Sequence, residues 1–333
     1  MLGALYAGLA ALTFALNNAT LRRGVVTGTV MQAMAVTVPA GAAGFVVLAL
    51  VADALPALIG FPAVAAGWMA GQGIVHFLIG RFFNYRANQL VGVNLSAPVV
   101  QLQVVVAMVL AVLTMHEPFT VLQSIGAVLM LAGSFATQTR STKKPPAATA
   151  SGNHPRGAPA FTPRHAAGYL FSSCAAIAYG ISPLMVRLAF DSAPQASVLA
   201  GAVIAYASAT AVFSFLLLRP EVRRDISGLK RENMPWFLCA AVLVTVSQGF
   251  VYASLAVAPL MVVTPILQTS LVFRVFLSWL INREYEVLNA SVLIGAAPAI
   301  IGSILVSLNT DFVASAAALP DALSSALRFR LAG

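Results

Sequence analysis

Two arginines lie inside long apolar segments, where a charged side chain is costly. Arg274 sits in LVFRVFLSW (271–279), and Arg81 lies near the end of another apolar segment. A charge inside a bilayer costs at least about 2.5–3.5 kcal/mol on insertion scales. Because a guanidinium binds carboxylates and phosphates in bidentate geometry, both arginines are candidate anchors for an anionic substrate. The structural alternative is a side chain that snorkels to the interface or bonds a backbone carbonyl.

Two glutamines follow prolines at the same spacing. Gln101 lies three residues after Pro98, and Gln268 lies three residues after Pro265. A proline inside a helix leaves a carbonyl four residues earlier without its hydrogen bond and can bend the helix. Each glutamine is therefore a candidate substrate ligand, with satisfaction of the opened backbone as the alternative.

Further polar residues stand within apolar segments. His76 is a candidate proton carrier, because its reference pKa lies near neutrality, and a hydrogen-bonded packing role is the alternative. Asn17, Asn18, Asn94 and Gln248 are candidate cavity-lining residues. Interhelical hydrogen bonding would explain the asparagines as well.

These residues belong to a pattern that occurs twice. Four residue types recur at one offset, since 252−85, 265−98, 268−101 and 284−117 all give 167. A duplicated membrane unit is the usual build of a secondary transporter, with the substrate held between the halves. The repeated tyrosines are candidate gates or interface anchors, and the repeated glutamates are expected to act at helix starts. The matched pairs are Tyr85 and Tyr252, Pro98 and Pro265, Gln101 and Gln268, and Glu117 and Glu284.

Acidic residues are missing from the confidently apolar segments, apart from the glutamates at turns. A transporter of organic cations would need a buried carboxylate to hold its cargo. The sequence therefore favours a small anionic or zwitterionic metabolite, such as an amino acid or organic acid, and export is one direction to consider. An organic-cation or multidrug exporter of the same fold and a non-transporting membrane protein are the alternatives.

Long apolar segments must position these side chains. The chain of 333 residues is 59% hydrophobic and 9% charged, against about 25% charged residues in soluble domains. Stretches of about 20 apolar residues recur, long enough to cross a bilayer as helices. The sequence predicts an all-α integral membrane protein with ten spans, listed as 2–20, 29–51, 60–84, 90–113, 119–137, 166–189, 197–218, 235–257, 260–281 and 287–308.

The spans divide into two halves of five. The expected division is a first repeat at 1–137, a polar linker at 138–165, a second repeat at 166–308 and a C-terminal tail at 309–333. Five spans per half is an odd number, so the repeats must insert with opposite orientation. Lys and Arg lie mainly in the loops after odd-numbered spans, which places both termini outside. The net charge of +9 follows this loop pattern, and no nucleic-acid partner is expected.

The chain resembles the drug/metabolite transporter superfamily, in particular its ten-helix EamA-type members. The resemblance rests on APVVQLQVVVAMVLAVLTMHEPFT (97–120) and TPILQTSLVFRVFLSWLINREYE (264–286), each followed by a glycine-punctuated span. It implies two inverted five-helix repeats, a cavity lined by spans one, three, four, six, eight and nine, and alternating access. The family's usual orientation has both termini cytoplasmic, in conflict with the loop charges.

Enzymatic activity is not expected, because phosphate-loop, His-Glu-x-x-His and Gly-x-Ser-x-Gly motifs are missing. Neither a cofactor nor a metal is expected. The expected partners are a small-molecule substrate and the lipid bilayer of a bacterial-type inner membrane, and a monomer is plausible.

Overall fold

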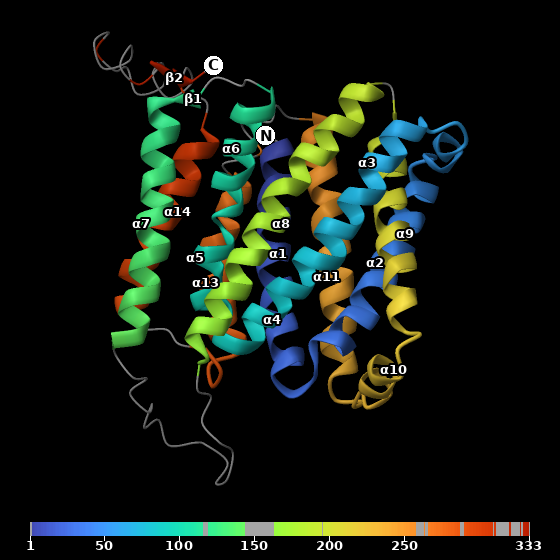
Figure 1. The fold of residues 1–333 in the computed structure, drawn as a ribbon, viewed down its shortest axis with the longest axis horizontal. Coiled ribbons are helices and arrows are strands. Elements are labelled where there is room, and N and C mark those ends of the chain that lie inside the picture. The colour runs from blue at the N-terminus through green and yellow to red at the C-terminus, as the bar shows by residue number, and fades with distance from the viewer. Residues whose placement is uncertain are drawn as a thin grey trace.

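A computed structural model describes residues 2–115, 119–143, 163–194, 196–257, 263, 266–286, 290–308, 310, 320, 327 and 329–332. Within them the chain forms a bundle of long helices that run roughly along one direction (Figure 1). The helices are α1 (Leu2–Thr27), α2 (Val30–Val51), η1 (Leu55–Leu58), α3 (Ala63–Gly73), η2 (Ile74–Gly80), α4 (Arg81–Val91), α5 (Val93–Val100), α6 (Gln103–Met115), α7 (Val121–Lys143), α8 (His165–Ser192), α9 (Val198–Leu216), α10 (Pro220–Ser227), α11 (Met234–Val257), α13 (Ser270–Ile281) and α14 (Ala290–Ser307). Two short strands, β1 (Phe119–Thr120) and β2 (Arg330–Ala332), pair antiparallel.

The predicted membrane fold is confirmed. In the described part of the chain, seven helical segments are long and apolar enough to cross a membrane. Three shorter apolar helices, Val121–Ala136, Ile266–Ile281 and Leu293–Val306, bring the number to ten. Leucines, valines and phenylalanines cover the outer surface, as expected of a face in contact with lipid.

The first and third spans are longer than predicted. The first was expected to end at residue 20, but α1 continues to Thr27 with Arg22 fully buried inside it. The third was expected to end at residue 84, but α3, η2 and α4 run continuously to Val91. Hydropathy underestimates both ends because their polar side chains are paired within the protein. Gln89, for example, donates to the carbonyl oxygen of Val25 at 3.0 Å.

The third span contains a π-helical section. η2 covers Ile74–Gly80 between the two α-helical parts. Gly73 enters this section where the chain presses against α9, because a Cβ there would lie 1.9 Å from the carbonyl oxygen of Ala205. π-Helical turns within α-helices occur frequently at functional sites, and this one precedes Arg81.

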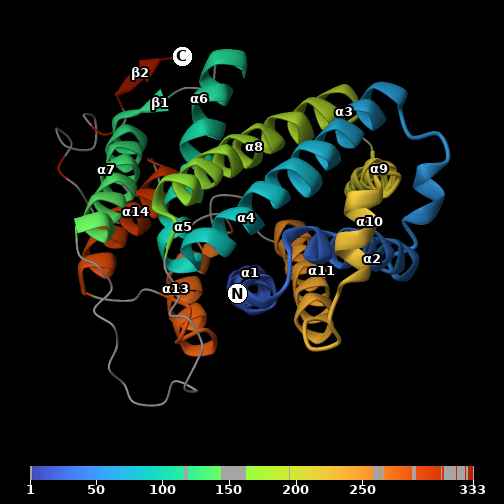
Figure 2. The ribbon, with the colours of Figure 1, turned by 60° about the horizontal axis from the view of Figure 1, so that its bottom comes forward.

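α1 lies at the centre of the bundle. Seen from the lower end of the molecule, it lies between α13 and α11, with α4 beside it (Figure 2). α13 and α11 belong to the second repeat, whereas α1 and α4 belong to the first. Residues of the two halves therefore meet around α1.

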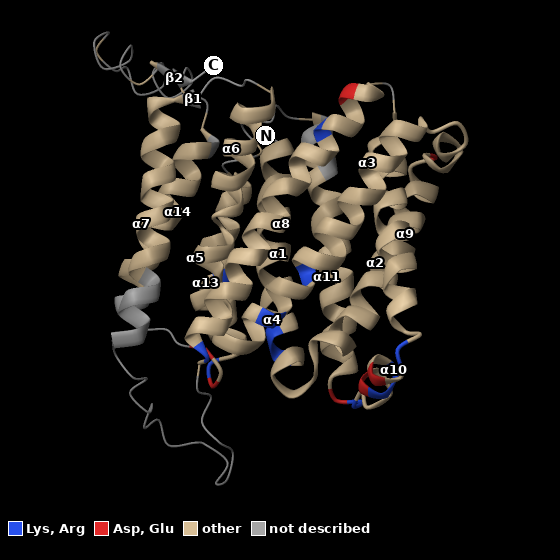
Figure 3. Ribbon diagram, viewed as in Figure 1, with Lys and Arg blue, Asp and Glu red and all other residues tan. Residues whose placement is uncertain are grey.

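Charged residues gather at one end of the bundle. Lys and Arg lie around α10, within α4 and in the turn after α13, toward the lower end in Figure 3. This agrees with the loop-charge pattern of the sequence. The orientation derived from it, with both termini outside, stays a prediction.

Candidate functional site

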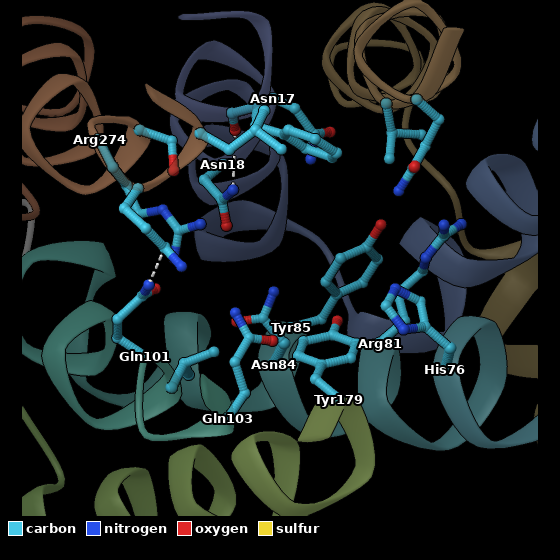
Figure 4. A pocket seen from close by; sticks show the side chains of 17 residues that line it. Asn17, Asn18, His76, Arg81, Asn84, Tyr85, Gln101, Gln103, Tyr179 and Arg274 are labelled. Carbon is cyan, nitrogen blue, oxygen red and sulfur yellow. Dashed lines mark hydrogen bonds between the residues drawn. The ribbon is translucent and has the colours of Figure 1, made fainter. Parts of the chain in front are cut away.

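A cavity of about 230 Å³ lies at the centre of the bundle, between the two halves (Figure 4). The helices around it are α1, the third and fourth spans, α8, α11 and the ninth span, the set that the resemblance implied. Its wall is rich in side-chain amides and holds no Asp or Glu among the described residues. The lining residues are Phe14, Asn17, Asn18, His76, Arg81, Asn84, Tyr85, Val100, Gln101, Gln103, Tyr179, Val244, Gln248, Leu267, Gln268, Ser270 and Arg274.

Repeat-matched positions line this cavity in pairs. Both copies of the proline motif are interrupted at the same place, since α6 begins at Gln103 and α13 at Ser270, and 270−103 is again 167. The walls contributed by the two halves are therefore related by the duplication. The pairs are Phe14 and Tyr179 at the first spans' offset of 165, and Arg81 and Gln248, Val100 and Leu267, Gln101 and Gln268, and Gln103 and Ser270 at 167.

The two matched glutamines bond to each other. The side-chain amide of Gln101 donates to the side-chain oxygen of Gln268, so the bond joins the first repeat to the second. Gln101 caps the end of α5, two residues before α6 begins. Both glutamines lie on the cavity wall as candidate ligands, and their mutual bond satisfies part of their hydrogen-bonding capacity.

Arg274 extends from α13 toward the cavity (Figure 4). Among the residues that the structure describes, its guanidinium has no hydrogen-bond or ion-pair partner, and its Nε is buried. Its repeat counterpart is Ala107, because 274−167 is 107. At this pair of matched positions, the second repeat alone carries a cation.

Arg81 lines the same cavity but is held by the protein. Its guanidinium donates to the carbonyl oxygen of Thr37 at 3.3 Å and to the hydroxyl of Tyr206 at 3.0 Å. It also lies over the rings of Phe77 and Tyr206, 5.3 and 5.5 Å from their centroids. Cation–π contacts of this kind stabilise a desolvated cation. Arg81 therefore adds positive charge to the wall with fewer donors left for a ligand than Arg274.

His76 lies in η2 and is held by neighbouring side chains. Its Nδ1 is 2.9 Å from the hydroxyl oxygen of Ser182, which also accepts from Gln72 at 2.9 Å. Its ring packs against Phe77 and Tyr179. These contacts match the packing alternative, while its place on the cavity wall keeps the proton-carrier hypothesis untested.

Asn17 and Gln248 also line the cavity, from α1 and α11. Asn17 is 7% exposed, and its side-chain oxygen has no partner among the described residues. Tyr85 lies on the wall and donates to the hydroxyl of Thr37 at 3.2 Å. Asn94 is not among the residues that line this cavity, and its predicted role stays untested. Because α5 starts at Val93, Asn94 falls in the first helical turn, and its backbone N–H donates to Glu286 at 3.0 Å.

An ion pair between the repeats lies beyond the cavity. Arg22 Nε is 3.2 Å from Glu286 Oε1, and both side chains are fully buried. Arg22 also donates to the carbonyl oxygens of Asn88, of Gln89 at 3.0 Å and of Tyr285 at 2.7 Å. Arg22 follows the cavity residue Asn18 by four positions, or one helical turn. This inter-repeat ion pair therefore joins the two halves about one turn from the cavity.

Glu286 also caps the start of α5. Its carboxylate accepts the backbone N–H groups of Val93 at 2.7 Å and Asn94 at 3.0 Å. Burial raises the pKa of the Glu286 carboxyl, whereas Arg22 and the two backbone N–H groups act in the opposite direction. Gly92 precedes α5 with φ +86, and a Cβ there would lie 2.8 Å from the carboxylate. Only a residue without a Cβ fits both the backbone conformation and this contact.

The remaining motif residues are placed in part. Pro98 lies inside α5, and its carbonyl oxygen accepts from Ser134 at 2.7 Å. Glu284 is exposed in the turn after α13, and the buried carboxylate of that turn is Glu286. Glu286 makes capping contacts to α5, and the helix-start role predicted for Glu284 stays a prediction. Glu117, Pro265 and the side chain of Tyr252 lie outside the described residues.

In the described ranges, no group of three or more His, Cys, Asp or Glu residues could hold a metal ion. The cavity instead offers one unpartnered guanidinium, several amides and two phenols. That set can bind and orient a polar solute.

Comparison with known proteins agrees with this architecture. The model of the EamA-like transporter family matches residues 1–138 and again 166–308. A solved structure described as "Crystal structure of protein" is similar in fold, with a TM-score of 0.54 and 16% sequence identity over 91% of this chain and 94% of that chain. No curated protein matches.

Proposed function

Because the chain belongs to the EamA-like transporter family, we propose that this multi-pass membrane transporter carries a small metabolite with an anionic or zwitterionic group. The observation that carries the proposal is the Arg274 guanidinium, which faces the cavity without a partner among the described residues. A buried guanidinium without a partner is costly. A ligand with an anionic group would pair with it and remove that cost, so such a ligand should bind more tightly than a neutral one. Arg81 adds to the positive potential.

The proposal includes alternating access. Substrate sites of duplicated transporters lie near the bilayer midplane at the interface between repeats, and this cavity is built from repeat-matched pairs. The inter-repeat ion pair is buried at one end, where it joins α1 to the turn after α13. Opening that end requires Arg22 and Glu286 to separate. We place the protein in a bacterial-type inner membrane, with export as one direction of transport.

Cavity size supports a metabolite rather than a bulky drug. The volume of about 230 Å³ lies below the range of roughly 300–1,000 Å³ that is common for drug-sized ligands. The described wall also lacks the carboxylate that an organic cation would need. Both observations argue against a multidrug exporter, which is the competing hypothesis that the experiment tests.

Counterflow in proteoliposomes tests the proposal. Pools of labelled amino acids, organic acids, phosphorylated sugars and organic cations would be offered to wild type, Arg274→Gln and the control Arg187→Gln. Arg187 is a suitable control because its side chain is 53% exposed, on α8. We expect exchange of an anionic or zwitterionic pool that Arg274→Gln abolishes and Arg187→Gln retains. Exchange of organic cations alone would favour the multidrug reading, and no exchange by folded protein would contradict transport of these classes.

A further inference from the structure

We propose that the substrate is a small hydroxylated anion, with its carboxylate or phosphate on Arg274 and its hydroxyl groups on the side-chain amides across the cavity. This inference rests on the proposed transport function and narrows its substrate class. Three features of the described wall carry it: one unpartnered cation, a wall without carboxylates, and amides that lack partners.

The first feature limits the number of charges. Arg274 is the lining arginine without hydrogen-bond partners among the described residues, whereas Arg81 is bonded to Thr37 and Tyr206. One guanidinium can bind one carboxylate or phosphate in bidentate geometry. The cavity therefore fits a substrate with a single anionic group.

The second feature argues against an ammonium group. The described wall holds no Asp or Glu, and two guanidinium groups already raise its potential. An ammonium beside them would be repelled in a site of low effective dielectric. Of the two classes left open by the proposed function, the anion fits this wall better than the zwitterion.

The third feature concerns the body of the substrate. Seven of the 17 lining residues are Asn or Gln, and such amides both donate and accept hydrogen bonds. The side-chain oxygen of the buried Asn17 has no hydrogen-bond partner among the described residues, and the half-buried side chains of Gln103 and Gln248 line the cavity without a described side-chain hydrogen bond. These three side chains come from α6, α11 and α1.

Hydroxyl groups complement such a wall. Each hydroxyl offers one donor and two acceptor sites, so it can serve the oxygen of Asn17 as well as the N–H groups of the glutamines. A hydrocarbon acid of the same length would displace water from the amides and leave them without hydrogen-bond partners, which weakens its binding. The wall therefore disfavours an apolar body, whereas Arg274 favours an anionic group.

Matched six-carbon probes test this inference. Dissociation constants would be measured by calorimetry on the full chain in detergent for gluconate, hexanoate, sorbitol and 2-amino-2-deoxygluconate. Glucose 6-phosphate separates phosphate from carboxylate recognition. We expect gluconate or glucose 6-phosphate to bind at least tenfold more tightly than each of the other three. The inference would be overturned if hexanoate, sorbitol or 2-amino-2-deoxygluconate bound as tightly as the hydroxylated anions or more tightly.

Two variants separate the roles of the wall. Arg274→Gln should weaken the hydroxylated anion at least tenfold and leave sorbitol unchanged. Gln248→Leu should weaken the hydroxylated anion and leave hexanoate unchanged or tighter. Arg187→Gln, outside the cavity, should alter neither. The proposed roles of Arg274 and Gln248 would be contradicted if Arg274→Gln also lost sorbitol binding and Gln248→Leu also lost hexanoate binding, with normal thermal unfolding of both variants.

Counterflow distinguishes failure of this inference from failure of the transport function. If wild type exchanges amino acids or organic cations and binds none of the hydroxylated anions, the substrate class is wrong and transport stands. If folded protein exchanges no pool and binds no probe, both proposals fail.

Discussion

Neutralising Glu286 should destabilise this protein far more than neutralising Glu284, two positions earlier in the same turn. Glu286 is fully buried against Arg22, whereas Glu284 is exposed. The substitution Glu286→Gln keeps the shape of the side chain and removes its charge. Glu284→Gln makes the same chemical change at an exposed position and is the matched control.

The expected size follows from the contacts of the carboxylate. Oε1 lies 3.2 Å from Arg22 Nε and accepts the N–H of Val93, and Oε2 accepts the N–H of Asn94. In glutamine one of these oxygens becomes an NH₂ group, so a donor faces a donor in either orientation. Breaking a buried ion pair by removing one partner typically costs about 3–5 kcal/mol, whereas the exposed control should change stability by less than about 0.5 kcal/mol.

The assay is thermal unfolding in detergent, followed by tryptophan fluorescence. A loss of 3–5 kcal/mol should lower the apparent melting temperature of Glu286→Gln by roughly 5 °C or more. The double variant Arg22→Met with Glu286→Gln should be less destabilised than the sum of the two single variants, because it leaves no buried charge.

Two results would refute this reasoning. One is a Glu286→Gln variant as stable as Glu284→Gln. The other is strict additivity in the double variant, which would mean that Arg22 and Glu286 contribute independently.

Three other outcomes are expected. Gly73→Ala should sharply reduce the yield of folded protein, because its Cβ would lie 1.9 Å from the carbonyl oxygen of Ala205. Gly67→Ala in the same helix has open space around it and should be neutral or slightly stabilising. Equal yields of the two variants in gel filtration would contradict this. Tyr206→Phe should cost about 1.5–3 kcal/mol in thermal unfolding through the lost hydrogen bond to Arg81, and an unchanged melting temperature would count against it. A single cysteine in α10 of a variant without native cysteines should react with an impermeant maleimide only after permeabilisation, and labelling of intact cells would reverse the predicted orientation.

The duplication made much of the fold predictable. A constant offset of 167 located both proline motifs, and the structure interrupts them at matched positions, before Gln103 and Ser270. It also brings Gln101 and Gln268 into contact. Two matched residues that both lie near the pseudo-symmetry axis between the repeats are close to each other. The constant spacing in the sequence is therefore enough to predict the contact between Gln101 and Gln268.

Other features depend on contacts between residues distant in sequence. Hydropathy predicts that the first span ends before Arg22, because it counts the charge of Arg22 but not its partner Glu286, 264 positions away. Asn94 lies in the first turn of α5, which begins at Val93, and is not among the lining residues of the cavity. The π-helical section has no local signal in the sequence either, and it arises where Gly73 packs tightly on α9.

The inter-repeat ion pair is buried, whereas the ion pair described at the matching position of the second repeat is exposed. At the first spans' offset of 165, Arg22 corresponds to Arg187, whose Nε lies 3.9 Å from the carboxylate of the exposed Asp191 on the same helix. An exposed pair contributes about 0–1 kcal/mol, less than the loss expected on breaking the buried one. A difference of about 2.8 kcal/mol between two conformations corresponds to a hundredfold ratio of their populations. Without substrate, most molecules would then rest with Arg22 and Glu286 joined, and the free energy of substrate binding would have to offset that preference in each transport cycle.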